Sequence, residues 1–128
     1  MSKSDYLAYD HIAHLEEVLK DAERVIREKD AQYAASWKSR GGVGAYMMLA
    51  RKWDRIEAAL SPMHLGDKVT CGLSVNINKP VAPYDIITAC IEDNRTEGIL
   101  DDIKDLRNYL TLVEAEVVAR LSGTKKVS

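Results

Sequence analysis

The chain has 128 residues, a length typical of one domain, and its hydrophobic fraction of 46% is sufficient for a packed core. Lys and Arg number 18 against 20 Asp and Glu, and this balance lacks the basic footprint of a protein that binds extended nucleic acid. Two cysteines without a CxxC motif, an N-terminus without an apolar signal region, and no apolar run near the roughly 20 residues that span a bilayer indicate a cytoplasmic protein with no membrane partner.

A long amphipathic helix is predicted over residues 5–36. Apolar residues recur there at alternating spacings of three and four, from Ile12 to Ile26, which is the period of one helix face. Ser4 is a suitable N-terminal cap. The glycine-rich segment 40–44 ends the helix, because each glycine costs a helix about 1 kcal/mol relative to alanine.

A second helix is predicted over residues 44–60, where apolar residues again alternate in spacing and Ser61-Pro62 provides the stop. The segment 61–82 has no strong periodicity, so we expect a long irregular crossover, with a brief extended stretch near 69–77. Pro83 fits the first position of a short third helix over residues 83–93.

A fourth helix begins near Thr96 and ends before Gly123, which is placed as a C-terminal cap. Its apolar stripe is the strongest in the chain and consists of Ile99, Ile103, Leu106, Leu110, Val113, Val117 and Leu121. The tail, residues 124–128, is expected to fray. The pattern predicts an all-α, four-helix bundle-like domain over residues 1–128 that oligomerises through its long striped helices.

Two pairs of acidic residues lie at helical spacing. Asp102 and Asp105 are three residues apart on the fourth predicted helix, and Asp54 and Glu57 are three apart on the second. If the two helices pack together, the four carboxylates can hold a hard cation such as Mg²⁺. The alternatives are a solvated acidic turn near a helix N-terminus for the first pair, and ion pairs with neighbouring basic residues for the second.

Basic and aromatic residues gather around the glycines. Lys52 and Arg55 are three residues apart, and Arg40 directly precedes the glycines, whose backbone N–H groups are suited to an anion. These three residues are candidate phosphate ligands. Tyr33 and Trp37, at i and i+4, are candidates for stacking on a nucleobase. An ordinary helix–helix turn and simple core packing are the competing interpretations.

One part of the sequence resembles a known family. The segments Tyr33-Ala34-Ala35-Ser36-Trp37, Arg40-Gly41-Gly42 and Ala50-Arg51-Lys52-Trp53-Asp54-Arg55-Ile56 resemble a family common in phages, the nucleotide modification associated domain 1. Lys52 and Arg55 match the Lys-x-x-Arg pair of that family. Ala34 stands where the family usually has glycine.

A second segment, Asp102-Ile103-Lys104-Asp105-Leu106-Arg107-Asn108-Tyr109-Leu110, is similar to the last conserved helix of MazG-like, all-alpha nucleoside triphosphate pyrophosphohydrolases. The two resemblances cover about half of the chain. They imply Mg²⁺ bound by an ExxE and an ExxD motif, hydrolysis of the alpha-beta phosphate bond, and a dimer or tetramer. The full ExxE motif is absent, and only Asp54 and Glu57 can stand for it.

Three hypotheses follow. The first is a Mg²⁺-dependent pyrophosphohydrolase acting on a nucleoside triphosphate, deoxynucleotide or modified nucleotide, in which the two acidic pairs hold the metal and carry catalysis. The second is a phage-type protein that binds or sequesters a nucleotide without cleaving it, located in the host cytoplasm if phage-encoded. The third is a structural helical oligomer. The second and third hypotheses do not need the carboxylates.

Overall fold

The computed structural model describes residues 7–33 and 36–127, and of residues 31–33 it describes the backbone. The chain divides into two compact units, residues 1–35 and residues 36–128. The fold is mostly helical, as expected, and its described strands form one two-stranded sheet. The expectation of one domain over residues 1–128 stays a prediction.

The first unit contains a short 3-10 helix, η1 (Ile12–His14), followed by α2 (Leu15–Tyr33). Leu7 and Ala8 are also helical, but residues 9–11 are not, so the helix predicted to run continuously from residue 5 is interrupted there. Asp10 explains the difference, because its Oδ1 accepts the backbone N–H groups of Ile12 at 3.1 Å and of Ala13 at 3.3 Å. The expected cap Ser4 lies outside the described residues.

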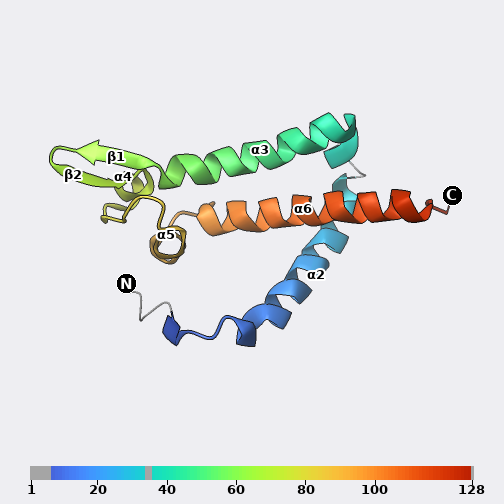
Figure 1. Ribbon diagram of the computed structural model, residues 1–128, viewed down its shortest axis with the longest axis horizontal. Coiled ribbons are helices and arrows are strands. Elements are labelled where there is room, and N and C mark those ends of the chain that lie inside the picture. The colour runs from blue at the N-terminus through green and yellow to red at the C-terminus, as the bar shows by residue number, and fades with distance from the viewer. Residues whose placement is uncertain (1–6, 34–35, 128) are drawn as a thin grey trace. The chain divides into compact units, whose positions relative to one another are not determined.

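The second unit is built on two long helices, α3 (Gly41–Leu60) and α6 (Ile99–Ser122), which run side by side in opposite directions (Figure 1). The 3-10 helix η2 (Ser36–Lys38) precedes α3. The helix α3 begins three residues before the predicted start, because packing along α6 offsets the low helix propensity of its glycines. Gly123 caps α6 with a φ of 70°, as the sequence predicts.

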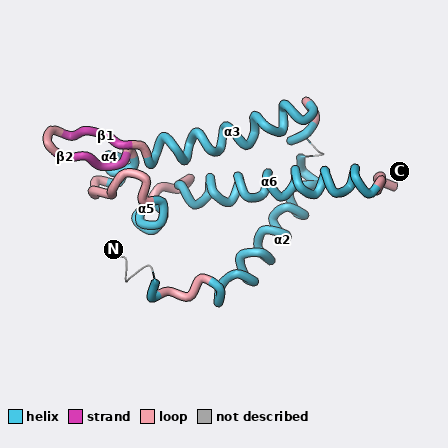
Figure 2. Tube along the Cα trace, viewed as in Figure 1, coloured by secondary structure: helices cyan, strands magenta, loops and turns pink. Residues whose placement is uncertain are grey.

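The predicted irregular crossover is mostly regular. Strands β1 (Pro62–Leu65) and β2 (Lys68–Cys71) form an antiparallel hairpin in which Pro62 faces Cys71 (Figure 2). Gly66, with a φ of 61°, makes the tight turn possible. The extended stretch expected near 69–77 is correct up to Cys71 and wrong beyond it, because α4 (Leu73–Ile77) is helical.

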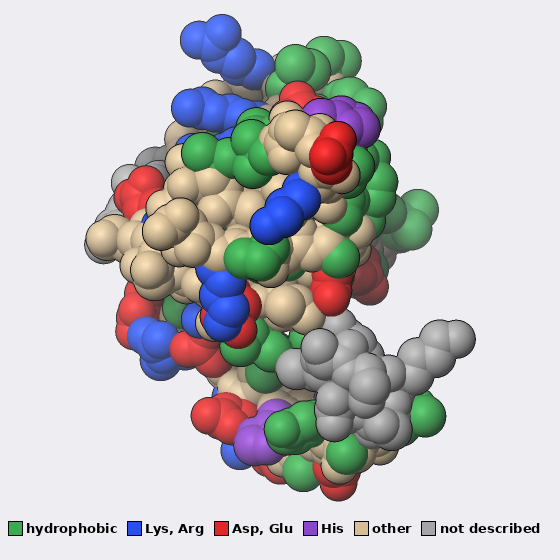
Figure 3. All heavy atoms as spheres, turned by 90° about the vertical axis from the view of Figure 1, so that its left-hand side faces the viewer, with side chains coloured by type: hydrophobic (Ala, Val, Ile, Leu, Met, Phe, Trp, Pro, Cys, Tyr) green, Lys and Arg blue, Asp and Glu red, His purple; other side chains and the backbone are tan. Residues whose placement is uncertain are grey.

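Much of the hairpin surface is apolar and open to solvent. Met63, Leu65 and Val69 are all exposed. Figure 3 looks toward the hairpin end of the second unit and shows hydrophobic side chains there mixed with charged ones. Thr70 and Cys71 are buried, so only the base of the hairpin joins the core.

The third predicted helix starts later than Pro83. Tyr84 has a φ of 62°, a left-handed conformation that a helix cannot include, and α5 (Ile86–Glu92) follows it. Asp85 is the N-cap, and its Oδ1 accepts the Thr88 N–H at 3.0 Å.

The hydrophobic core lies at one end of the helix pair. There the end of α3 meets the base of the hairpin, α4, α5 and the start of α6. Its buried members are Ile56, Leu60, Cys71, Leu73, Val81, Ala89 and Ile99. The polar backbone of this junction is satisfied locally, since the Cys71 N–H donates to the Val81 carbonyl at 2.8 Å and the Val81 N–H donates to Ser74 Oγ at 2.9 Å.

Asp93 fixes the start of α6. Its Oδ2 accepts the Ile99 N–H at 2.8 Å, and Arg95 donates to both of its carboxylate oxygens at 2.9 Å. Gly98 leaves room for this carboxylate, because a Cβ there would lie 2.6 Å from Asp93 Oδ2 and one of the two would have to shift. The hydrogen bonds from Arg95, helped by the Ile99 N–H, lower the pKa of Asp93 to about 2.

We expect Asp93→Asn to lower the free energy of unfolding near neutral pH by roughly 2 kcal/mol, because a carboxylate with a lowered folded-state pKa stabilises the fold above its unfolded-state pKa. The difference between wild type and variant should shrink as the pH falls from about 5 to about 2, where Asp93 takes up a proton. Urea denaturation at several pH values measures this. Asp67→Asn in the exposed hairpin turn is the control, and an equal, pH-independent loss in both variants would contradict the prediction.

Candidate functional site

A charged cluster lies between α3 and α6. Lys52 Nζ is 3.0 Å from Asp105 Oδ2 and 4.0 Å from Asp102 Oδ1, and Arg55 Nε is 3.0 Å from Asp102 Oδ1. The Asp102 side chain is only 8% exposed, whereas the side chain of Arg55 is 47% exposed. The structure thus brings together four of the residues singled out in the sequence, two cations from α3 and two carboxylates from α6.

The other acidic pair does not join this cluster. Successive residues lie about 100° apart around a helix. Asp54 is therefore on the side of α3 opposite to Lys52 and the buried Ile56, and Glu57 is turned about 140° away from Lys52. Both are exposed. The prediction that the two acidic pairs converge is therefore wrong, and the physical reason is that α3 turns its cations, not its carboxylates, toward α6.

This arrangement does not fit the magnesium site that the resemblance implies. Mg²⁺ needs oxygen ligands in an octahedral set, whereas Asp102 and Asp105 face Arg55 and Lys52 at ion-pair distance. Across the described parts of the chain, no group of three or more His, Cys, Asp or Glu side chains could hold a metal ion.

The remaining predicted site residues lie toward the other end of α3. Arg40 is exposed at the N-cap of α3, twelve residues before Lys52, which is about 18 Å along a helix. It therefore does not share a site with Lys52 and Arg55. Trp37 belongs to η2 and lines a pocket. The Tyr33 side chain lies outside the described residues, so its predicted stacking role stays a prediction.

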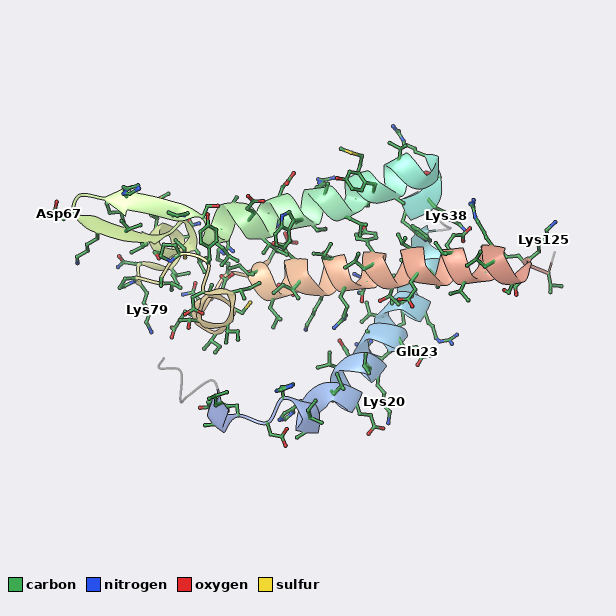
Figure 4. The ribbon with its side chains drawn as sticks, viewed as in Figure 1. Lys20, Glu23, Lys38, Asp67, Lys79 and Lys125 are labelled. Atoms are coloured by element: carbon green, nitrogen blue, oxygen red, sulfur yellow. The ribbon has the colours of Figure 1, made fainter. Side chains whose placement is uncertain are left out.

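The pocket lies between the start of α3 and the last turns of α6, and it has a volume of about 320 Å³. Figure 4 labels Lys38, which comes from η2 at this end of the helix pair. The lining residues combine an aromatic and aliphatic wall, which includes Trp37, Tyr46, Leu49 and Val113, with the cations Lys38 and Arg120. A pocket of this composition suits a ligand with a flat apolar part and an anionic part.

Glu116 pairs with both cations of the pocket. Lys38 Nζ donates to Glu116 Oε1, and Arg120 Nε donates to Glu116 Oε2 at 2.9 Å. These hydrogen bonds, the one from Lys38 first, lower the pKa of Glu116. Lys38 Nζ also lies 5.7 Å from the ring centroid of Trp37, within cation–π range. The three charged groups together carry a net positive charge.

The first turn of α3 opens onto the same pocket. Arg40 makes no side-chain capping hydrogen bond, so no N-cap side chain occupies the first N–H groups of α3. Gly41 and Gly42 both line the pocket, and a Cβ at either would meet no atom within 4 Å. The backbone here is therefore accessible from the pocket, which favours an anion at a helix N-terminus.

Sequence reasoning missed two pocket residues, Glu116 and Arg120. The signal that could have found them is their position on α6. They continue, at spacings of three and four, the face that begins with Asp102 and passes through Val113. The polar and apolar residues of this face, taken together, predict that both side chains lie on the side of α6 that meets α3.

Comparisons with protein-family models, with curated proteins and with solved structures find no match for this chain. Within the described residues, no helix combines the length and apolar character needed to cross a bilayer.

We expect Asp102→Asn to lower the free energy of unfolding by roughly 2 kcal/mol, because it leaves Arg55 and Lys52 facing a neutral group in a half-buried interface. Asp54→Asn, on the exposed side of α3, should change it by no more than about 0.5 kcal/mol. Chemical denaturation of both variants measures the difference. Equal effects would show that the two aspartates have similar surroundings, contrary to the structure.

Proposed function

We propose that this chain binds a nucleotide, or a closely related phosphorylated aromatic compound, in the pocket between α3 and α6. The observation that carries the proposal is the composition of that pocket, in which two aromatic rings, two cations and an uncapped helix start line one space of about 320 Å³. Small-molecule sites are typically of this size, mostly apolar with a few polar groups. A cytoplasmic location is part of the proposal.

Each part of a nucleotide has a counterpart in the lining. The base would stack on Trp37 or Tyr46, since aromatic faces accept flat rings without a strict hydrogen-bond pattern. The phosphate would accept from Arg120, whose fork suits phosphate oxygens, and from backbone N–H groups at the start of α3. Glu116 opposes this, because a phosphate must compete with its carboxylate for the same cations.

Binding without hydrolysis is the form of the proposal that the geometry favours. The MazG-like hypothesis needs carboxylates available to a metal, and Asp102 and Asp105 instead face cations of α3. The sequence predicted Lys52 and Arg55 as phosphate ligands. A phosphate placed there would meet cations that already have carboxylate partners. For these reasons the proposal places the ligand in the pocket and assigns no catalytic residue.

The test uses the fact that the chain has two tryptophans. Trp53→Phe replaces the more exposed one and leaves Trp37, in the pocket, as the only tryptophan reporter. Its fluorescence is titrated with nucleoside mono- and triphosphates, with nucleosides and with inorganic phosphate. We expect a saturable change in fluorescence with nucleotides and a weaker change with nucleosides or inorganic phosphate alone.

Three further substitutions in that background locate the ligand. Arg120→Glu should weaken nucleotide binding about tenfold or more, since a hydrogen bond to a charged group contributes roughly 1.5–3 kcal/mol. Glu116→Gln should strengthen it, because it removes the competing carboxylate. Lys104→Glu reverses an exposed charge elsewhere on α6 and is the matched control.

Two outcomes would contradict the proposal. One is the absence of a fluorescence change with any nucleotide in a folded sample. The other is equal weakening by Arg120→Glu and Lys104→Glu, which would indicate non-specific attraction. Chromatography of the nucleotides after incubation with Mg²⁺ completes the experiment, and we expect them intact. Release of pyrophosphate would instead support the hydrolase hypothesis.

A further inference from the structure

The helix α6 has a second face, distinct from the one that meets α3. The side that faces α3 and η2 carries Asp102, Asp105 and Glu116, as their ion pairs with residues of these two elements show. The second face consists of residues that recur at spacings of three and four along the helix, namely Leu100, Ile103, Arg107, Leu110, Glu114, Val118 and Leu121.

The apolar residues of this second face are unusually open to solvent. Leu100 is 49% exposed, Leu110 51%, Val118 56% and Leu121 84%. Single exposed apolar residues are normal, but a row of them along one face of a 24-residue helix indicates a surface that is covered by a partner.

The two charges on this face decide what the partner is. Arg107 and Glu114 are seven residues apart, two helical turns, so they lie on the same face with opposite sign. A second copy of α6 packed in parallel and in register would set Arg107 against Arg107. A second copy packed antiparallel would set Arg107 of each copy against Glu114 of the other.

We propose that a second copy of this chain docks on this face, antiparallel, with a two-fold axis passing between Leu110 and Thr111. This one register pairs both charges at once. It also sets Leu100 opposite Leu121, and Ile103, which is half-buried against the core, opposite Val118, so apolar residues meet apolar residues on both sides of the charged pairs. Such self-complementarity is what a closed two-fold interface requires of a single surface.

Arg107 is half-buried, and Glu114 is exposed. The Arg107 Nε donates to Asn108 Oδ1 at 3.2 Å and its Nη2 is buried, so the carboxylate of a second copy would meet the part of the guanidinium that stays accessible. The inference is independent of the ligand proposed for the pocket.

Sedimentation equilibrium of the full chain tests the proposal. Wild type should be a dimer, and Glu114→Arg or Arg107→Glu alone should weaken the dimer at least about tenfold, because each places like charges together twice. The double variant, Arg107→Glu with Glu114→Arg, should restore dimerisation. Lys68→Glu, a charge reversal on the exposed hairpin, is the control and should leave the dimer unchanged.

A disulfide experiment tests the orientation. In a Cys90→Ser background, chains with Ile103→Cys are mixed with chains that have Val118→Cys, and mild oxidation should link the two kinds of chain to each other. Linkage of residue 103 to residue 103 would indicate a parallel pair and overturn the register. A monomeric wild type, dimers unaffected by the single reversals, or a charge-swapped double variant that folds by circular dichroism but stays monomeric would overturn the proposal itself.

Discussion

The pairing of carboxylates on α6 with cations on α3 determines how the second unit is put together. Asp102 is buried beside Arg55, and Asp105 lies beside Lys52, so a shift of either helix by one residue would leave a charge in the interface without its partner. Apolar contacts alone tolerate sliding better than charged ones do. The pairing therefore supports one alignment of the two helices, and every other site along them depends on that alignment.

From this alignment the two ends of the helix pair acquire different characters. At one end, Ile56 and Ile99 enter a core completed by the hairpin base, α4 and α5. At the other end, among the residues that the structure describes, neither the hairpin nor α4 or α5 is present, and α3 and α6 leave a pocket with Trp37 and Lys38 of η2 at its side. The packed end supplies rigidity, and the open end supplies accessible groups, which is a common division between scaffold and ligand site.

The sequence predicted helices well where a single signal was strong. The stripe of α6 and its glycine cap correctly predicted this helix and its C-terminal end, because spacing and capping agreed, although the helix begins at Ile99 and not near Thr96. The hairpin was harder to foresee, since its strands have four residues each and a short strand has little periodicity to detect. Likewise, Asp10 shows how a local side-chain hydrogen bond determines where a helix starts.

The candidate site shows what spacing cannot provide. Two residues three apart share a helix face, but the spacing does not say whether that face turns toward the neighbouring helix. On α3 the pair Lys52 and Arg55 and the pair Asp54 and Glu57 interleave, so only the packing decides between them. In the structure the cations of α3 face α6, where the carboxylates of Asp102 and Asp105 pair with them. The pocket residues Glu116 and Arg120 depend on the same choice.

The placement of the core at one end has a dynamic consequence. Backbone amides near Leu73 and Ala89, which are fully buried, are expected to exchange with deuterium only through global opening, whereas the first turn of α3 can open locally. The open end would then act as a separate cooperative segment of low local stability. A molecule held there would slow amide exchange at the start of α3 and the end of α6 and leave the core amides almost unchanged.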